Sequence, residues 1–92
     1  MKVVITGAAK RDLANLDKTL AKRIAFVIDQ LAAKPETIAI SQLRGKPKLY
    51  KVRVGQWRII LSINHESETA YIVRVRHRRD AYKMLWQHPS MN

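Results

Sequence analysis

Basic side chains are the residues of this sequence whose types and spacing could do chemistry. Lys51, Arg53 and Arg58 lie close together in a stretch, residues 37–65, that contains no acidic residue. The chain has no cysteine, no carboxylate pair among its seven scattered acids and no glycine-rich phosphate loop. Its three histidines also lack the spacing of a metal site. We therefore expect neither a metal nor a cofactor.

Cations without carboxylates still suit one reaction, the cleavage of RNA by its own 2′-hydroxyl. The hydroxyl attacks the adjacent phosphate if a base removes its proton and if cations stabilise the charge that develops on phosphorus. A lysine serves as that base when neighbouring cations lower its pKa, because a like charge disfavours the protonated form. Lys51 beside Arg53 and Arg58 fits this description.

Charge is distributed unevenly along the chain. It has 18 Lys and Arg against 7 Asp and Glu, a formal net charge of +11. The net charge is +3 over residues 1–36 and +8 over residues 37–92. Such a field attracts polyanions, which makes nucleic acid or an acidic protein the expected partner. A charge that only serves solubility, or a membrane-surface patch, is the alternative.

The elements that must position these cations begin with a strand and a helical hairpin. Residues 2–6 are rich in β-branched side chains and predict a strand that ends at Gly7. Residues 8–16 predict a short helix, and Asp17 is the expected cap of a longer one that Pro35 stops. The longer helix carries a stripe of apolar residues at helical spacing: Leu20, Ile24, Val27, Ile28 and Leu31.

Beyond an expected loop at residues 37–48, the hydrophobic period changes to two. Three strands are predicted: residues 49–54, 57–64 and 69–76. Gly55 and Gln56 suit a two-residue type II′ turn between the first two. A short helix could follow over residues 79–87.

The turn sets the register of the hairpin, because Val54 then pairs with Trp57 and Arg53 with Arg58. One face is predicted to be apolar, with Trp57 in the core: Tyr50, Val52, Val54, Trp57, Ile59 and Leu61, joined by Tyr71, Val73 and Val75. The other face is predicted to be cationic and open to solvent: Lys51, Arg53, Arg58, Arg74 and Arg76. Like charges opposed across strands cost about 0.2–1 kcal/mol. Either Arg53 and Arg58 extend into water, or an anion lies between them.

These elements predict the α+β class. The expected architecture is an N-terminal strand, a helical hairpin and a three-stranded antiparallel meander that completes a four-stranded sheet. We expect one domain over residues 1–88 and a frayed tail over residues 89–92. No signal peptide and no apolar run of about 20 residues are visible, so a cytoplasmic location without membrane contact is expected.

Several motifs resemble the toxins of the RelE/ParE superfamily, and in particular the RelE-like branch with its microbial RNase fold. They are Leu43-Arg44-Gly45, residues 50–55 (Tyr-Lys-Val-Arg-Val-Gly), residues 57–60 (Trp-Arg-Ile-Ile) and residues 75–82 (Val-Arg-His-Arg-Arg-Asp-Ala-Tyr). The resemblance covers nearly the whole chain. It implies the toxin of a type II toxin–antitoxin system, a ribosome-dependent, metal-independent endoribonuclease (an mRNA interferase) that cuts messenger RNA in the ribosomal A site, inhibits translation and arrests growth.

The resemblance also implies roles for single residues. Lys51 and Arg53 match the family's basic pair, one of which acts as general base, and Arg58 and Arg78 match its phosphate-stabilising arginines. Tyr82 matches, at a different distance from Arg78, a tyrosine that stacks on the base or assists proton transfer; His77 is the alternative proton donor. The expected RNA-binding residues are Arg44, Lys46, Lys48, Arg74, Arg76, His77 and Arg79. The sequence departs from the family at Trp57, where Tyr is common, and at Arg76, where Gly is frequent.

The resemblance leaves a second class open, the ParE branch, which has the same fold but inhibits DNA gyrase by binding it. Members of that branch generally lack the basic cluster, so Lys51, Arg53, Arg58 and Arg78 favour the RNase. A domain that binds nucleic acid without catalysis is a third class. The expected partners are a cognate acidic antitoxin and the ribosome with its messenger RNA. The toxin–antitoxin complex is expected to bind operator DNA through the antitoxin.

Overall fold

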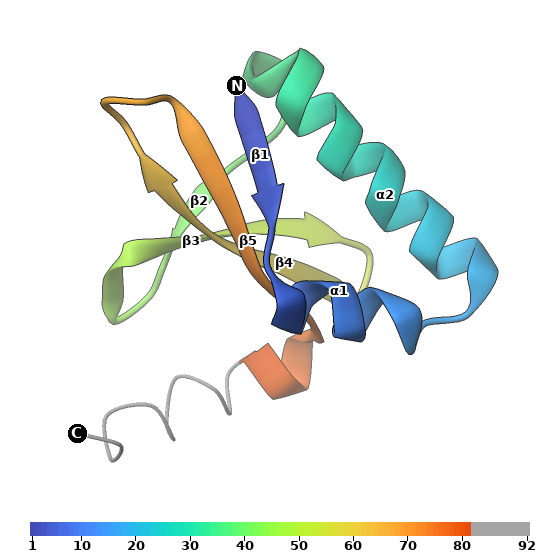
Figure 1. Ribbon diagram of the computed structural model, residues 1–92. Helices are drawn as coiled ribbons and strands as arrows, with labels where there is room; N and C mark the ends of the chain where they lie inside the picture. Colours follow the sequence, from blue (N-terminus) through green and yellow to red (C-terminus); the bar gives the residue numbers. More distant parts are fainter. Residues whose placement is uncertain (82–92) are drawn as a thin grey trace.

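The computed structural model describes residues 1–81, except for the side chain of Pro47. Within this range five strands form one mixed sheet in the order β1-β5-β4-β3-β2 (Figure 1). The strands are β1 (Lys2–Ile5), β2 (Ser41–Leu43), β3 (Lys46–Val54), β4 (Trp57–Asn64) and β5 (Thr69–His77). Two helices, α1 (Gly7–Ala14) and α2 (Lys18–Ala33), precede a 3₁₀ turn, η1 (Pro35–Thr37). The predicted α+β class is confirmed.

Both helices begin at side-chain caps. Asp17 accepts a hydrogen bond from the Leu20 amide at 2.7 Å, which is the predicted cap of α2. Thr6 was expected inside a strand, but it caps α1 by accepting from the Ala9 amide, and its hydroxyl donates to the Ile72 carbonyl at 2.8 Å. The first strand therefore ends one residue earlier than predicted, and the first helix spans residues 7–14 instead of 8–16. Neither helix of this part of the chain has the length and hydropathy needed to span a membrane.

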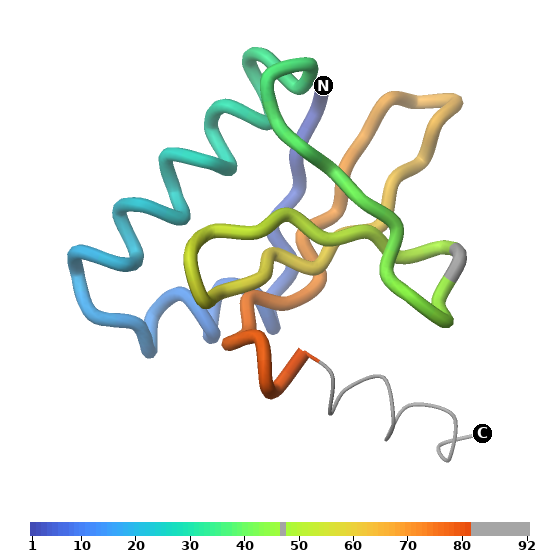
Figure 2. Tube along the Cα trace, turned by 180° about the vertical axis from the view of Figure 1, so that it is seen from behind, coloured from blue at the N-terminus to red at the C-terminus, as the bar shows by residue number. Residues whose placement is uncertain are grey.

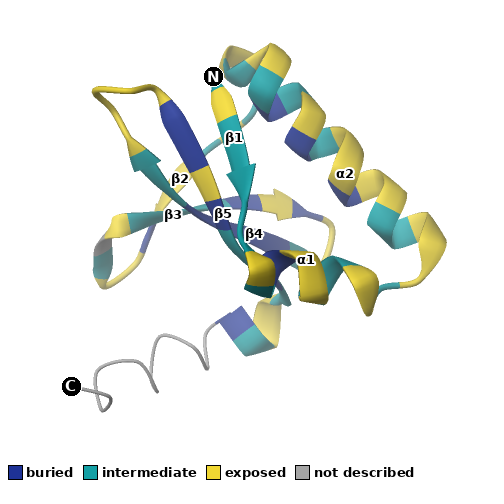
Figure 3. Ribbon diagram, viewed as in Figure 1, coloured by how far each residue is buried: buried dark blue, intermediate teal, exposed yellow. Residues whose placement is uncertain are grey.

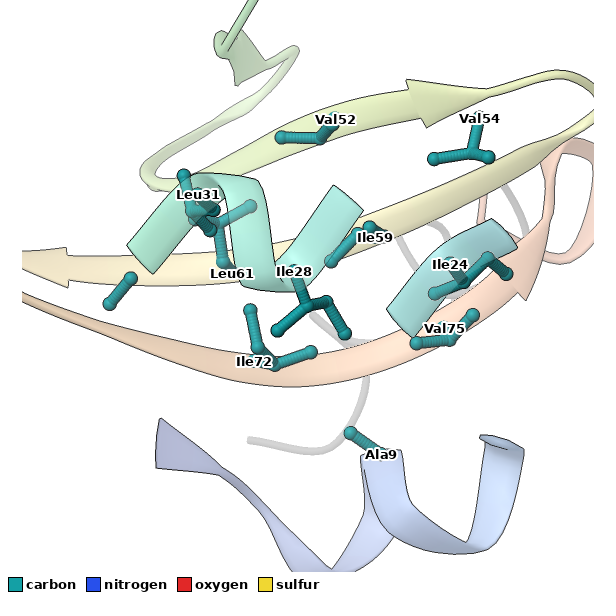
Figure 4. Packing of buried hydrophobic residues seen from close by; sticks show 11 residues of the cluster. Ala9, Ile24, Ile28, Leu31, Val52, Val54, Ile59, Leu61, Ile72 and Val75 are labelled. Atoms are coloured by element: carbon teal, nitrogen blue, oxygen red, sulfur yellow. The ribbon is translucent and has the colours of Figure 1, made fainter. Parts of the chain in front are cut away.

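The core lies between α2 and one face of the sheet, called here the inner face (Figures 3 and 4). The predicted stripe of α2 supplies Ile24, Ile28 and Leu31, all at most 5% exposed. They pack against buried residues of β3, β4 and β5: Val52, Val54, Ile59, Leu61, Ile72 and Val75. The opposite side of the sheet is called the outer face.

The register predicted for β3 and β4 is confirmed, since Val54 pairs with Trp57, Arg53 with Arg58 and Lys51 with Ile60. Gly55 has a φ of +60°, whereas the φ of Gln56 is not positive. This combination is the one that a type II′ turn requires.

The sheet has five strands, not four, because the segment expected to be a loop contains β2. Figure 2 shows the hairpin of β2 and β3 from behind. Ser41 and Gln42 pair with Lys51 and Tyr50, and the register then shifts before Leu43. A strand of three residues with an interrupted register is too short to produce a recognisable alternation of apolar and polar residues.

A bulge in β5 overturns the face predicted for Tyr71. Ile60 pairs with Arg74 but the next residue, Leu61, pairs with Ile72, so Val73 is an extra residue. Ile72 is consequently buried in the core, while Tyr71 is on the outer face and 38% exposed. Strict alternation would have reversed these two positions.

Candidate nucleic-acid interface

Three of the predicted catalytic cations surround one small pocket on the outer face. This outer pocket has a volume of about 10 Å³ and is lined by Leu43, Lys51, Arg58, Arg78 and Ala81. Its residues come from β2, β3, β4 and a helical turn at residues 78–81. No acidic residue of the described chain lines it. A space of this size admits about one water molecule.

An apolar cluster on the outer face determines where these cations lie. Ile60 is fully buried there, against Leu43 and Ala81, with Leu49 packed at the side. The cluster packs the helical turn at residues 78–81 and the end of β2 against Ile60 of β4. The cationic face is therefore partly covered, which corrects the expectation that it is open to solvent.

Arg58 is the clearest departure from that expectation, because it is only 9% exposed. Its Nη1 donates hydrogen bonds to the carbonyl oxygens of Gly55 at 3.1 Å and Trp57 at 2.9 Å. Arg53, directly opposite, is exposed and does not line the outer pocket. The two arginines, although directly opposed, therefore lie in different environments.

The turn between β3 and β4, which contains Gly55 and Gln56, also positions Arg78. The Arg78 amide donates to the Gln56 carbonyl at 2.8 Å, where the helical turn begins directly after β5. Of the four predicted catalytic cations, Arg58 is therefore attached to this turn through its side chain and Arg78 through its backbone.

Arg74 and Arg76 have an acidic neighbour that the sequence did not reveal. Asp12 of α1 accepts hydrogen bonds from Arg74 Nε at 2.9 Å, from Arg74 Nη2 at 3.1 Å and from the Val75 amide at 2.9 Å. Arg76 Nη1 lies 4.0 Å from the same carboxylate. Neither arginine lines the outer pocket, and both were predicted to bind RNA.

Burial of Asp12 acts to raise its pKa, but the hydrogen bonds from Arg74 and the Val75 amide, with the charges of Arg74 and Arg76, outweigh it and lower the pKa. The hydrogen bond to Asp12 in turn raises the pKa of Arg74. The folded state therefore favours the ionised forms of both Asp12 and Arg74. The contact fixes α1 at the edge of β5.

The remaining predicted RNA contacts lie in two places. Arg44, Lys46 and Lys48 are on the hairpin of β2 and β3, with Arg44 and Lys48 exposed. His77 ends β5, accepts from the Arg79 amide at 3.4 Å and meets the Trp57 ring edge-on, with 5.6 Å between ring centroids. Tyr82 lies outside the described residues.

The fold is shared with toxins whose structures are known. A RelBE toxin–antitoxin complex from Mycobacterium tuberculosis contains a chain that is 26% identical, with a TM-score of 0.71, and the match covers 83% of this chain and 95% of that one. The archaeal RelE–RelB complex from Pyrococcus horikoshii is 27% identical, with a TM-score of 0.69 and coverage of 84% and 93%. The RelBE complex of Escherichia coli, at 18% identity, a TM-score of 0.66 and coverage of 83% and 94%, is similar in fold.

These similarities define the class as the RelE/ParE superfamily of toxins from toxin–antitoxin systems. Residues 3–82 match the model of one family, described as the ParE toxin of the type II toxin–antitoxin system parDE. The chain belongs to this family. No curated protein matched the sequence.

Proposed function

We propose that this toxin is a metal-independent endoribonuclease that cleaves messenger RNA in the ribosomal A site and so stops translation. The observation that supports this most is the convergence of Lys51, Arg58 and Arg78 around the outer pocket without a carboxylate. Cations directed at one point are the arrangement that stabilises the charge developing on a phosphate during cleavage.

In the proposed reaction, a 2′-hydroxyl of the RNA attacks the neighbouring phosphorus and the bond to the 5′-oxygen breaks, which leaves a 2′,3′-cyclic phosphate. Lys51 takes the proton of the hydroxyl as general base. Arg58 and Arg78 stabilise the charge that builds up on the phosphate oxygens, and Arg53 contributes charge from the solvent side. His77 or Tyr82 supplies the proton to the leaving oxygen.

The test is to express variants without an antitoxin, measure growth and map the ends of messenger RNA on translating ribosomes. Lys51→Arg keeps the charge, but a guanidinium does not give up a proton, so cleavage should fall by about 10²–10⁴-fold. Arg78→Ala should reduce cleavage by about 10²–10³-fold. Lys10→Ala, which removes one charge from an exposed position on α1, is the control and should cleave normally.

The family match favours a second candidate, because the matched model is described as the ParE toxin. In that case the toxin inhibits DNA gyrase by binding. Intact messenger RNA together with gyrase-trapped DNA breaks in arrested cells would establish this candidate and reject the nuclease.

An acidic antitoxin encoded beside the toxin is the proposed partner in either case, since the related structures from M. tuberculosis and P. horikoshii are toxin–antitoxin complexes. We expect the complex to form in the cytoplasm and to bind operator DNA through the antitoxin. Co-purification of the neighbouring gene product, with restored growth, is the expected result.

A further inference from the structure

A second cleft lies on the other side of the turn between β3 and β4 from the outer pocket. This turn cleft has a volume of about 330 Å³ and opens between α2 and the turn, which face each other in Figure 1. It is lined by Asp17, Thr19, Leu20, Arg23, Val54, Gln56 and Trp57. Trp57 is only partly buried, so its indole contributes both to the core and to the cleft wall.

Guanidinium groups lie on both sides of this turn. On the inner side, Arg23 Nη2 is 3.5 Å from the position that a Cβ would take at Gly55. On the outer side, Arg58 is bonded to the Gly55 carbonyl, and the Arg78 amide is bonded to the Gln56 carbonyl. A nucleic-acid backbone that passes over the turn therefore meets a cation on each side.

The chemistry of the turn cleft is that of a site for a flat, neutral, polar group. The lining contains one cation, Arg23, and one carboxylate, Asp17, and Thr19 and Gln56 add hydrogen-bonding groups beside the indole. An acidic peptide would be repelled by Asp17, whereas a nucleobase carries no charge and offers donors and acceptors on its edge. Unpaired RNA bases are commonly held against aromatic rings and guanidinium planes.

We infer that the turn cleft binds one unpaired nucleobase of the same RNA strand whose phosphate lies at the outer pocket, with Trp57 and Arg23 against the base. The identity of the strand rests on the proposed nuclease function. The cleft would then fix the strand on the protein and select the nucleotide beside the cut.

The experiment measures binding of uncleavable RNA by the fluorescence of Trp57. The whole chain is used with Trp86→Phe, so that Trp57 is the only indole. The probes are hexamers of 2′-O-methyl adenosine, cytidine or uridine, which cannot react, and an abasic hexamer with the same phosphates. Arg23→Ala is compared with Lys22→Ala, which removes the same charge from the next residue of α2, also exposed but outside the cleft.

We expect base-containing hexamers to quench Trp57 and the abasic hexamer to leave its emission unchanged. Arg23→Ala should weaken binding of the base-containing hexamers by about tenfold more than Lys22→Ala does. Gln56→Ala, which changes no charge, should alter the preference among the three bases.

Equal losses in Arg23→Ala and Lys22→Ala, with equal binding of the abasic hexamer, would overturn the inference, because binding would then be purely electrostatic. So would an Arg23→Ala variant that binds RNA normally but no longer binds the antitoxin, since the cleft would then be a protein site. Because the hexamers cannot be cleaved, quenching does not depend on catalysis. Normal cleavage in Arg23→Ala with unchanged KM and no quenching would reject the cleft and leave the nuclease proposal intact.

Discussion

Asp12 is the residue through which pH should act on the fold. Its pKa is lowered below the ordinary value of 3.8, so its stabilising contacts with Arg74 and Val75 are complete above that pH and are lost as the pH falls through the lower, folded-state pKa. Asp12→Asn should reduce the free energy of unfolding by about 1–2 kcal/mol at neutral pH. Urea unfolding across the acid range measures the difference.

The sign of this effect can be checked in the same series. Below the folded-state pKa the wild-type carboxyl is protonated, so the curves of the wild type and Asp12→Asn should converge. If the two proteins differed in free energy of unfolding as much at acid pH as at neutral pH, an ionic role for Asp12 would be contradicted.

Single residues also show how much of the site the sequence alone can predict. Lys51, Arg58 and Arg78 were selected from their types and from the family resemblance, and the fold brings them around one pocket. The burial of Arg58 was not predictable, because its hydrogen bonds go to backbone carbonyls of a turn and no side-chain pattern records them. The contact of Asp12 with Arg74 joins residues 62 positions apart, so local spacing carries no sign of it.

The turn between β3 and β4 is the element that Arg58 supports. Arg58→Ala would leave the Gly55 and Trp57 carbonyls without this donor, and should cost about 2–3 kcal/mol. For a domain of this size that loss lowers the melting temperature by roughly 10 °C or more. Thermal unfolding followed by circular dichroism gives the value.

Arg53→Ala is the matched control, since Arg53 occupies the opposed position but is exposed. Removing it relieves a like-charge pair and should leave the melting temperature unchanged or slightly raised. Equal destabilisation by the two substitutions would show that the carbonyl contacts of Arg58 do not support the turn.

Elements with a strong local signal were predicted best. The register of β3 and β4 followed from Gly55 and from strict alternation, and the stripe of α2 followed from helical spacing. β2 was missed because three residues with an interrupted register show no alternation, and the bulge at Val73 was missed because it appears only in the pairing of β5 with β4. The resulting errors were the number of strands in the sheet and the face assigned to Tyr71 and its neighbours in β5.

At the scale of the whole molecule, the formal charge of +11 should govern how fast the proposed acidic antitoxin finds the toxin. Charges steer encounter more than they hold a formed complex, so the association rate constant should fall steeply with salt while the dissociation rate changes little. Stopped-flow association from about 0.05 to about 0.5 M salt measures this, because the screening length shortens severalfold over that range. An association rate that is independent of salt would contradict electrostatic steering.

The parallel pairing of β1 with β5 has a consequence for the order of events during synthesis. Lys2 to Ile5 pair with Thr69 to Ile72, so β1 leaves the ribosome well before the strand with which it pairs. Contacts that span this much of a chain also form slowly. The outer pocket needs Arg78 and Ala81 as well, which are made later still. In a chain with this topology, the sheet and the outer pocket therefore stay incomplete until synthesis has passed residue 81, and the proposed activity should appear only after that point.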